Sequence, residues 1–240
     1  MNENQIELSL VLACYNEAAY LRDSISHICG VLDSTDITYE IIFVDDKSSD
    51  NTRNVITELV EHSPKKLRKV FNKRNLGRGG AVSRGILRAK GEFVGYIDLD
   101  LEVGAHYIPY CIQELRTNAD VVTAWRIYRL EFHNVIRWIA SRGYSALVKL
   151  FLKLPYHDTE TGFKFFRRQQ ILRVLQDVKE NGWFWDTEIM ARCHLKKLSV
   201  VEKPCLFIRR HDKESSVHLL RDSSQYFMKL LKYRRELSAQ

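Results

Sequence analysis

A cluster of carboxylates follows a short apolar stretch near the middle of the chain. Residues 93–97 are aromatic, β-branched and glycine residues that predict a buried strand, and Asp98, Asp100 and Glu102 come just after them. If the end of this strand stays extended, Asp98 and Asp100 project to the same side. Mg²⁺ is often held by one or two carboxylates together with the phosphates of a substrate. The pattern predicts a site for a divalent metal and a diphosphate, and its alternative is a solvated acidic turn.

Polar residues also follow three earlier predicted strands, at residues 6–13, 39–44 and 67–71. Segments with helical apolar spacing separate the strands, so the order predicts an α/β fold with a mostly parallel, Rossmann-like sheet covered by helices on both faces. Ligands of such sheets bind outside the carboxyl ends of the strands. The candidates for nucleotide binding at these ends are Ala13, Tyr15, Glu17, Asp45, Asp46, Asn75, Gly77 and Gly80.

The roles of these polar clusters follow from their chemistry. Asp45 or Asp46 offers an acceptor for a base N–H or a ribose hydroxyl, and the alternative is a cap on the next helix. The glycines of residues 72–80 lead into a predicted helix at 79–90, with Gly91 as its C-cap, and would let backbone amides approach an anion. The stretch lacks the GK[ST] ending of a Walker A loop, and no GxGxxG follows the first strand. A dinucleotide-binding Rossmann protein is therefore disfavoured.

The composition narrows the class of protein. A chain of 240 residues with 45% hydrophobic content can bury a substantial core. Lys and Arg number 37 against 30 Asp and Glu, and the formal net charge of +7 favours phosphorylated small molecules, acidic membranes or nucleic acid as partners. The five cysteines have no CxxC spacing, which fits a reducing cytoplasm. No secretory signal or run of 18 apolar residues is present, so any membrane contact should be peripheral.

Four motifs occur in an order and at separations that resemble the family-2 glycosyltransferases with the GT-A fold. They are ACYNEAAYL, EIIFVDDKSSDNT, NLGRGGAV and YIDLDLE. The chain is most similar to the polyprenyl-phosphate (dolichol-phosphate) mannosyl- and glucosyltransferases, and the likeness continues through AWR, NVIRWIASRGYSALV, DTETGFKFFRR, FWDTEIMAR and RRHDKESSV. The chain departs from the family pattern in four residues. These are Ala13 in place of Pro, Lys47 in place of Gly, and Leu99 and Glu102 in place of the Ala and Gln of DADLQ.

The resemblance implies a division of labour along the chain. A GT-A catalytic domain at residues 1–217 would consist of a nucleotide-sugar half (1–125) and an acceptor half (126–217), followed by a basic amphipathic helix at 218–240. The implied ligands of Mg²⁺ or Mn²⁺ are Asp98, Asp100 and Glu102. The residues implied at the acceptor phosphate are Arg126, Arg137 and Ser141. The residues implied on a loop that closes over the donor diphosphate are Arg210, Glu214 and Ser215.

The second half of the chain holds further candidates and further predicted elements. Candidates for contacts with the sugar, or for shaping its site, are Asp158, Gly162, Asp186 and Glu188. Their alternatives are an ordinary turn for the first two and a favourable helix N-terminus for the two carboxylates after it. Strands are predicted at 119–125, 163–167 and 200–210, with helices at 134–154, 169–178 and 218–235. The first and last of these helices either pack on the domain or contact lipid headgroups.

These predictions combine into an inverting transfer of a hexose from a UDP- or GDP-linked sugar to a polyprenyl or dolichyl phosphate. A phosphate monoester is mostly ionised at neutral pH, so positioning and charge neutralisation would suffice without a strong base. The expected location is peripheral, at the cytoplasmic face of a membrane. A membrane-anchoring subunit is left open as a partner, and nucleic acid is not expected as one.

Three other functions fit parts of the pattern. A family-2 transferase acting on a glycan hydroxyl would need an Asp or Glu base, with Asp158 or Asp186 as first candidates. A haloacid-dehalogenase-type phosphatase also uses DxD, but normally after its first strand, whereas DLD here follows the fourth. A non-enzymatic basic binding module would still bind its anionic partner after replacement of Asp98 by Ala.

Overall fold

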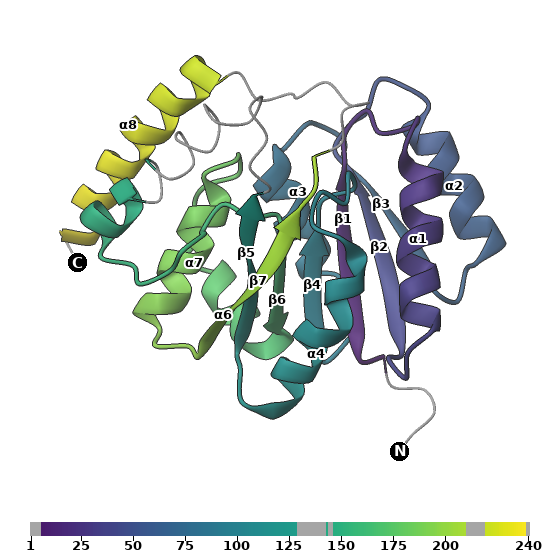
Figure 1. Ribbon diagram of the computed structural model, residues 1–240. Helices are drawn as coiled ribbons and strands as arrows, with labels where there is room; N and C mark the ends of the chain where they lie inside the picture. Colours follow the sequence, from purple (N-terminus) through teal and green to yellow (C-terminus); the bar gives the residue numbers. More distant parts are fainter. Residues whose placement is uncertain (1–5, 129–142, 144–145, 210–218, 239–240) are drawn as a thin grey trace.

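The computed structural model describes residues 6–128, 143, 146–209 and 219–238 (Figure 1). Within the C-terminal helix it describes the side chains of residues 226 and 228–236. Five residues implied at the acceptor phosphate or the closing loop lie outside the described residues. They are Arg137, Ser141, Arg210, Glu214 and Ser215.

A seven-stranded mixed sheet forms the middle layer. Its strands are β1 (Leu8–Cys14), β2 (Tyr39–Asp45), β3 (Leu67–Phe71), β4 (Phe93–Ile97), β5 (Val121–Tyr128), β6 (Phe163–Arg167) and β7 (Val200–Phe207). Their order across the sheet is β3-β2-β1-β4-β6-β5-β7, and β6 runs antiparallel to both of its neighbours. The predicted mostly parallel α/β sheet is confirmed, and β3, β4 and β6 have the predicted bounds.

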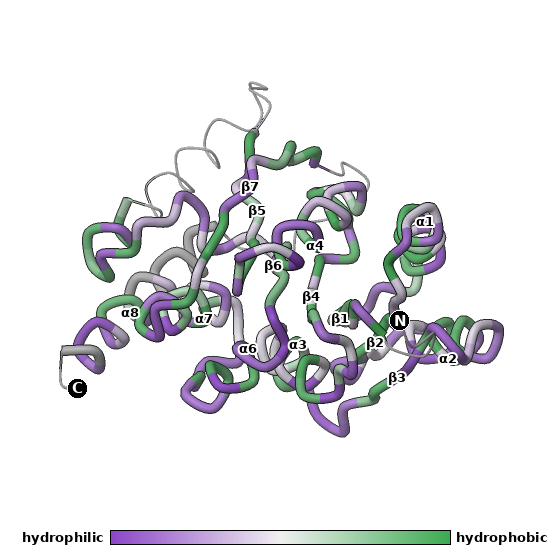
Figure 2. Tube along the Cα trace, turned by 90° about the horizontal axis from the view of Figure 1, so that it is seen from below, coloured by the Kyte–Doolittle hydropathy of each residue, from purple (hydrophilic) through white to green (hydrophobic). Residues whose placement is uncertain are grey.

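Helices cover both faces of this sheet, as Figure 2 shows from below. They are α1 (Leu21–Asp33), α2 (Thr52–His62), α3 (Arg78–Ile86), α4 (Ile108–Thr117), α6 (Arg168–Leu175), α7 (Trp185–Leu195) and α8 (Leu219–Ser238). Helices α1, α2 and α4 share one hydrophobic cluster with one face of the sheet, and α3, α6, α7 and α8 share another with the opposite face. Because alternate strand residues point to opposite faces, Leu10 and Leu12 join the first cluster and Val11 the second.

The segment between β3 and β4 differs from its prediction. Helix α3 ends at Ile86, so Gly91 is not its C-cap and that prediction is wrong. A Cβ at Gly91 would lie 2.7 Å from the backbone nitrogen of Ser9, so glycine is required by close contact with β1 rather than by helix termination.

The two helices that sequence placed either on the domain or against lipid are described in part. Residues 146–152 are helical within the predicted 134–154 segment, whose earlier part lies almost wholly outside the described residues. Helix α8 confirms the predicted C-terminal helix. In the parts of the chain that the structure describes, no helix has the length and apolar character needed to cross a bilayer.

Candidate functional site

The carboxyl ends of the parallel strands meet at one edge of the sheet, at the top of Figure 1. At this rim the loops after β1 and β2 are joined by hydrogen bonds. The Asn16 N–H donates to Ser48 Oγ (2.9 Å), and the Ser49 N–H donates to Asn16 Oδ1 (2.8 Å). The Ala18 N–H donates to Asp50 Oδ2 (3.2 Å). Asn16 has a φ of 57°, a left-handed conformation that Asn adopts more readily than most residues. Through these hydrogen bonds the two loops form one connected wall.

Four predicted nucleotide-binding residues lie on or beside this wall. The Tyr15 side chain is exposed, whereas Ala13 and Glu17 are half-buried. The Glu17 N–H donates to Thr52 Oγ1 (2.8 Å), which adds a further link between the two loops. Asn75 is exposed on the loop after β3. An exposed ring at this place can stack on a base, so the position of Tyr15 is compatible with its predicted role, which stays a prediction.

Asp45 and Asp46 are buried and hold the rim loops in place. Arg53 Nε donates to Asp45 Oδ2 at 2.6 Å. The N–H groups of Leu76 and Gly77 donate to the Asp46 carboxylate, each at 2.8 Å. Neither Asp caps α2, whose N-cap makes no side-chain hydrogen bond. The structure therefore gives both residues a positioning role, and their direct contact with a base or ribose stays a prediction.

The glycines at the start of α3 serve close packing. Gly77 has a φ of 82°, and a Cβ there would lie 2.6 Å from the Asn181 carbonyl oxygen. A Cβ at Gly79 would lie 2.3 Å from Cβ of Trp185, the first residue of α7. The Gly80 N–H donates to the Asn181 carbonyl oxygen (2.9 Å). Both N–H groups bond within the protein, and the contact of Gly77 and Gly80 with an anion stays a prediction.

The three carboxylates after β4 lie in a turn rather than on an extended strand. Leu101 has a φ of 54°, and its N–H donates to the Asp98 carbonyl oxygen (3.2 Å). The Glu102 N–H donates to Asp100 Oδ1 (3.3 Å). The chain leaves the strand after Ile97, so the extended end from which Asp98 and Asp100 were expected to project to the same side is not formed. Among the described residues, no three His, Cys, Asp or Glu side chains are grouped to hold a metal, so the three-carboxylate ligand set is not formed by the protein alone.

Arg78, which sequence reasoning did not select, binds the first of these carboxylates. Its Nε and Nη2 donate to Asp98 Oδ1 at 3.0 and 2.6 Å. The Asp98 N–H donates to the Gly162 carbonyl oxygen (3.0 Å), and a Cβ at Gly162 would lie 1.8 Å from Asp98 Oδ2. The Asp98 side chain is 43% exposed against 11% for Arg78. The guanidinium is thus held below the rim, while the Asp98 carboxylate reaches it.

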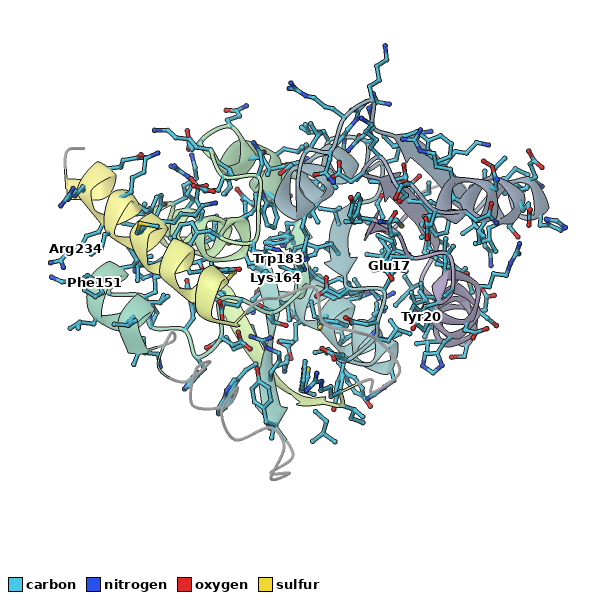
Figure 3. All side chains as sticks on the ribbon, turned by 90° about the horizontal axis from the view of Figure 1, so that it is seen from above. Glu17, Tyr20, Phe151, Lys164, Trp183 and Arg234 are labelled. Atoms are coloured by element: carbon cyan, nitrogen blue, oxygen red, sulfur yellow. The ribbon has the colours of Figure 1, made fainter. Side chains whose placement is uncertain are left out.

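Asp186 anchors Arg78 from the opposite side. The buried Asp186 carboxylate accepts hydrogen bonds from Arg78 Nη1, Tyr96 Oη and Lys164 Nζ, the last at 3.1 Å. Burial and the Asp186 charge raise the pKa of Tyr96, which keeps its hydroxyl protonated as a donor. Lys164, labelled in Figure 3, is fully buried with its Nζ 5.7 Å from the centre of the Tyr96 ring. Burial lowers the pKa of Lys164 although Asp186 opposes this. The Asp186 oxygens are thus engaged inside the protein, and the contact of Asp186 with a sugar stays a prediction.

Glu188 also has an internal role. Its buried carboxylate accepts from the N–H groups of Lys179 (3.1 Å) and Glu180 (2.8 Å) and forms an ion pair with Arg192 (2.6 Å). The carboxylate therefore fastens the loop before α7 to that helix. The contact between Glu188 and a sugar stays a prediction.

Arg126 forms the acceptor side of the rim, where β5 ends. Its Nε and Nη2 donate to the two carboxylate oxygens of Asp158 at 2.6 and 3.0 Å. Burial raises the pKa of Asp158, but the Arg126 guanidinium outweighs this and the pKa is lowered. Glu160 lies 4.0 Å from Arg126 Nη2, and burial raises its pKa to about 7 against the opposing charge of Arg126. The structure thus brings together the predicted residues Arg126 and Asp158 and adds Glu160.

Comparison with known proteins agrees with this geometry. The sequence model of Glycosyl transferase family 2 matches residues 9–175. The chain belongs to this family. It is 30% identical over 222 residues to the glycosyltransferase AglD of Haloferax volcanii, and 28% identical over 227 residues to the dolichyl-phosphate beta-glucosyltransferase of Saccharomyces cerevisiae. These alignments cover 90% and 85% of this chain, but 35% of AglD and 67% of the yeast enzyme, so the chain spans about a third of the length of AglD.

The family-2 enzyme also shares its fold with solved structures. Glucosyl-3-phosphoglycerate synthase from Mycobacterium tuberculosis, in complex with Mn²⁺, UDP and glucosyl-3-phosphoglycerate, superimposes with a TM-score of 0.69 at 19% identity. The match covers 95% of this chain and 79% of that one. This confirms the predicted GT-A fold. The chain is therefore a family-2 glycosyltransferase with this fold.

Several site residues of this glycosyltransferase escaped sequence reasoning. They are Asn16, Arg78, Tyr96, Glu160 and Lys164. A signal existed for Arg78, which stands in the NLGRGGAV motif directly before two glycines. Lys164 gave none, because a lysine in a short strand is expected to face solvent.

Proposed function

We propose that this glycosyltransferase moves a hexose from a UDP- or GDP-sugar to a polyprenyl or dolichyl phosphate, with inversion at the anomeric carbon. The observation that carries the acceptor is the similarity, over 85% of the chain, to a protein named dolichyl-phosphate beta-glucosyltransferase. The donor class is supported by the structural neighbour that holds UDP and Mn²⁺. The relatives therefore support the substrates, and the residues of the rim support the roles proposed below.

On the donor side, Asp98 and Asp100 would hold Mn²⁺ or Mg²⁺ together with the donor diphosphate. These two carboxylates suit the cation, because Mn²⁺ and Mg²⁺ prefer carboxylate and phosphate oxygens and need few protein ligands when a substrate completes the site. When bound, the cation would neutralise charge on the departing nucleotide diphosphate. Asp98 is partly exposed, so it could turn toward the cation, while Arg78 keeps a positive charge beside it. Tyr15 would stack on the base.

On the acceptor side, Arg126 would bind the lipid phosphate. A guanidinium carries five N–H donors, so Arg126 can keep its pair with Asp158 and present the remaining donors to a phosphate. The Asp158 pair fixes the plane of the guanidinium before the substrate arrives. Arg137, Ser141 and Arg210 are proposed to join it, as the family resemblance implies.

The two Asp candidates for a general base are poorly suited to activate a glycan hydroxyl. Asp158, a first candidate for a general base, is paired with Arg126 and has a lowered pKa, which makes it a weak base. Asp186 is buried among three donors. Glu160, with a pKa raised to about 7, is the better base and would serve if the acceptor were a hydroxyl. A phosphate oxygen needs no such base.

The test is nucleotide release from a panel of UDP- and GDP-sugars, with and without polyprenyl phosphate and Mn²⁺. Release that depends on both the lipid and the metal is expected for one donor. Release that requires neither would contradict the proposal. Turnover on soluble sugars, with none on lipid phosphate, would assign the glycan-hydroxyl function instead.

A further inference from the structure

Two neighbouring helices pack side by side on the face of the sheet that carries α7. The helix at residues 146–152 enters the hydrophobic cluster through Val148, and α8 enters it through Leu230 and Tyr233. The Arg234 guanidinium lies over the Phe151 ring at 5.0 Å, as Figure 3 shows at its left. Because each helix buries one side in this shared cluster, its opposite side faces solvent.

Helical spacing identifies the outward side of α8. Met228, Lys232 and Arg235 are separated by four and three residues, so they share one side, and all three are exposed. This side lies opposite the buried Leu230 and Tyr233. The Met228 side chain is 62% exposed although it is apolar.

The outward side of the neighbouring helix has the same character. Lys149 and Leu150 are exposed opposite the buried Val148, and Lys153 is exposed just after the helix. Leu150 is 70% exposed, a second large apolar side chain in water. Each helix therefore carries two basic residues beside one protruding apolar residue.

The acidic partners of α8 lie on its flank. Lys229 Nζ binds Glu180 at 2.6 Å, and Lys179 Nζ binds Glu236 at 3.3 Å. Both ion pairs tie α8 to the loop before α7. They fix the rotation of α8 about its own axis. Glu236 is engaged with Lys179, away from the outward side of the helix.

The exposed basic and apolar side chains on the outward sides of the two helices are called the basic face. Its members are Lys149, Leu150, Lys153, Met228, Lys232 and Arg235. We propose that the basic face lies on a membrane that contains anionic lipids. Basic side chains near such a surface are attracted by its negative potential, and apolar side chains among them can enter the boundary between headgroups and acyl chains. A soluble polyanion would use the charges but would gain nothing from Leu150 and Met228.

The position of the basic face in the fold relates membrane contact to the acceptor side of the rim. Helix α8 lies on the same side of the molecule as the carboxyl ends of β5 and β7 (Figure 1). Contact with a membrane would therefore hold the Arg126 side of the rim near the headgroups. The inference rests on the proposed function in this respect, because a polyprenyl phosphate is a membrane lipid.

Co-sedimentation of the full chain with vesicles tests the inference without donor or acceptor. Binding is expected to vesicles of phosphatidylcholine with phosphatidylglycerol, not to phosphatidylcholine alone, and should weaken as salt is added. Replacement of Lys149, Lys232 and Arg235 by Gln should lower the partition coefficient roughly a hundredfold, since each basic residue near an anionic leaflet contributes about a factor of five. A matched control replaces three exposed lysines outside this face by Gln, namely Lys65, Lys69 and Lys90.

A second variant separates a membrane from a soluble polyanion. Replacement of Leu150 and Met228 by Gln should weaken vesicle binding severalfold and leave binding to heparin unchanged. All changed side chains are exposed, and circular dichroism verifies the fold. Equal loss in the control, or absence of binding to anionic vesicles, would overturn the inference. So would vesicle binding that is indifferent to Leu150 and Met228. An enzyme that transfers sugar in detergent yet ignores vesicles refutes only the basic face, and nucleotide release without lipid refutes only the proposed function.

Discussion

The donor and acceptor sides of the rim use the same kind of ion pair in different ways. On the donor side, Asp98 shares Arg78 with Asp186, and its side chain is 43% exposed. On the acceptor side, Asp158 holds Arg126 with both oxygens, and its side chain is 8% exposed. An exposed carboxylate that shares its cation can exchange partners, whereas a buried one in a two-point pair is kept for geometry. Asp98 therefore suits a ligand that comes and goes, and Asp158 suits the positioning of Arg126.

The substitution Asp98→Asn tests the donor side and has the largest expected effect. We expect activity to fall by a factor on the order of 10² to 10³, since the carboxylate proposed to hold the cation beside the departing diphosphate is lost. Stability should change little, because the side chain is partly exposed. Steady-state nucleotide release and thermal unfolding measure the two effects. A variant with full activity would remove Asp98 from the chemistry.

Gly162→Ala tests whether Asp98 must keep its present position. The new Cβ would lie 1.8 Å from Asp98 Oδ2 and 2.3 Å from Arg78 Nη2, so both groups must move. We expect activity to fall at least about tenfold, because displacement of a positioned group by an ångström can lower rates by about 10². Gly30→Ala in α1, where no atom lies within 4 Å, is the control and should stabilise the protein by up to about 1 kcal/mol. Equal activity in both variants would contradict this role of Gly162.

Asp158→Asn tests the acceptor side through stability. Loss of one partner from a buried pair leaves Arg126 uncompensated and should lower the free energy of unfolding by about 3 kcal/mol in urea denaturation. Asp33→Asn removes an exposed pair with Lys66 and should change it by less than about 1 kcal/mol. Because the Asp158 pKa is lowered by folding, its contribution is present above the pKa of the unfolded chain and lost as pH falls through the folded value. Similar changes in both variants would show that Asp158 is not a buried anchor.

Glu160→Gln gives the smallest effect and refines the acceptor assignment. Folding raises the Glu160 pKa from 4.5 to about 7, so the folded state holds its proton more tightly and loses stability as pH rises through this window. The variant should lack this loss, which urea denaturation at several pH values measures. Transfer to polyprenyl phosphate should continue. If transfer stopped while the fold remained, Glu160 would be a general base and the glycan-hydroxyl function would gain support.

Local patterns predicted the scaffold well. The bounds of β3, β4 and β6 follow from short segments rich in apolar residues and flanked by turn residues or glycine, since aromatic and β-branched residues favour strands. The convergence of polar loops at one rim also followed, because parallel strands place their carboxyl ends together. Local patterns misjudged the glycines, since the neighbours that exclude a Cβ at Gly79 and Gly91 come from distant segments.

The sequence by itself determined the alternation of strands and helices in the first half, the family and the loops that meet at the rim. Those properties depend on local periodicity and on motif spacing, which a linear chain displays directly. Only the tertiary structure decided which charges meet there. Arg78 joins Asp98 to Asp186, and Asp186 is 108 residues from Arg78 along the chain. Lys164 lies buried beside Asp186. Such partners are selected by how α3, α7 and the sheet pack together, because a buried charge must find its counterion in space rather than in sequence.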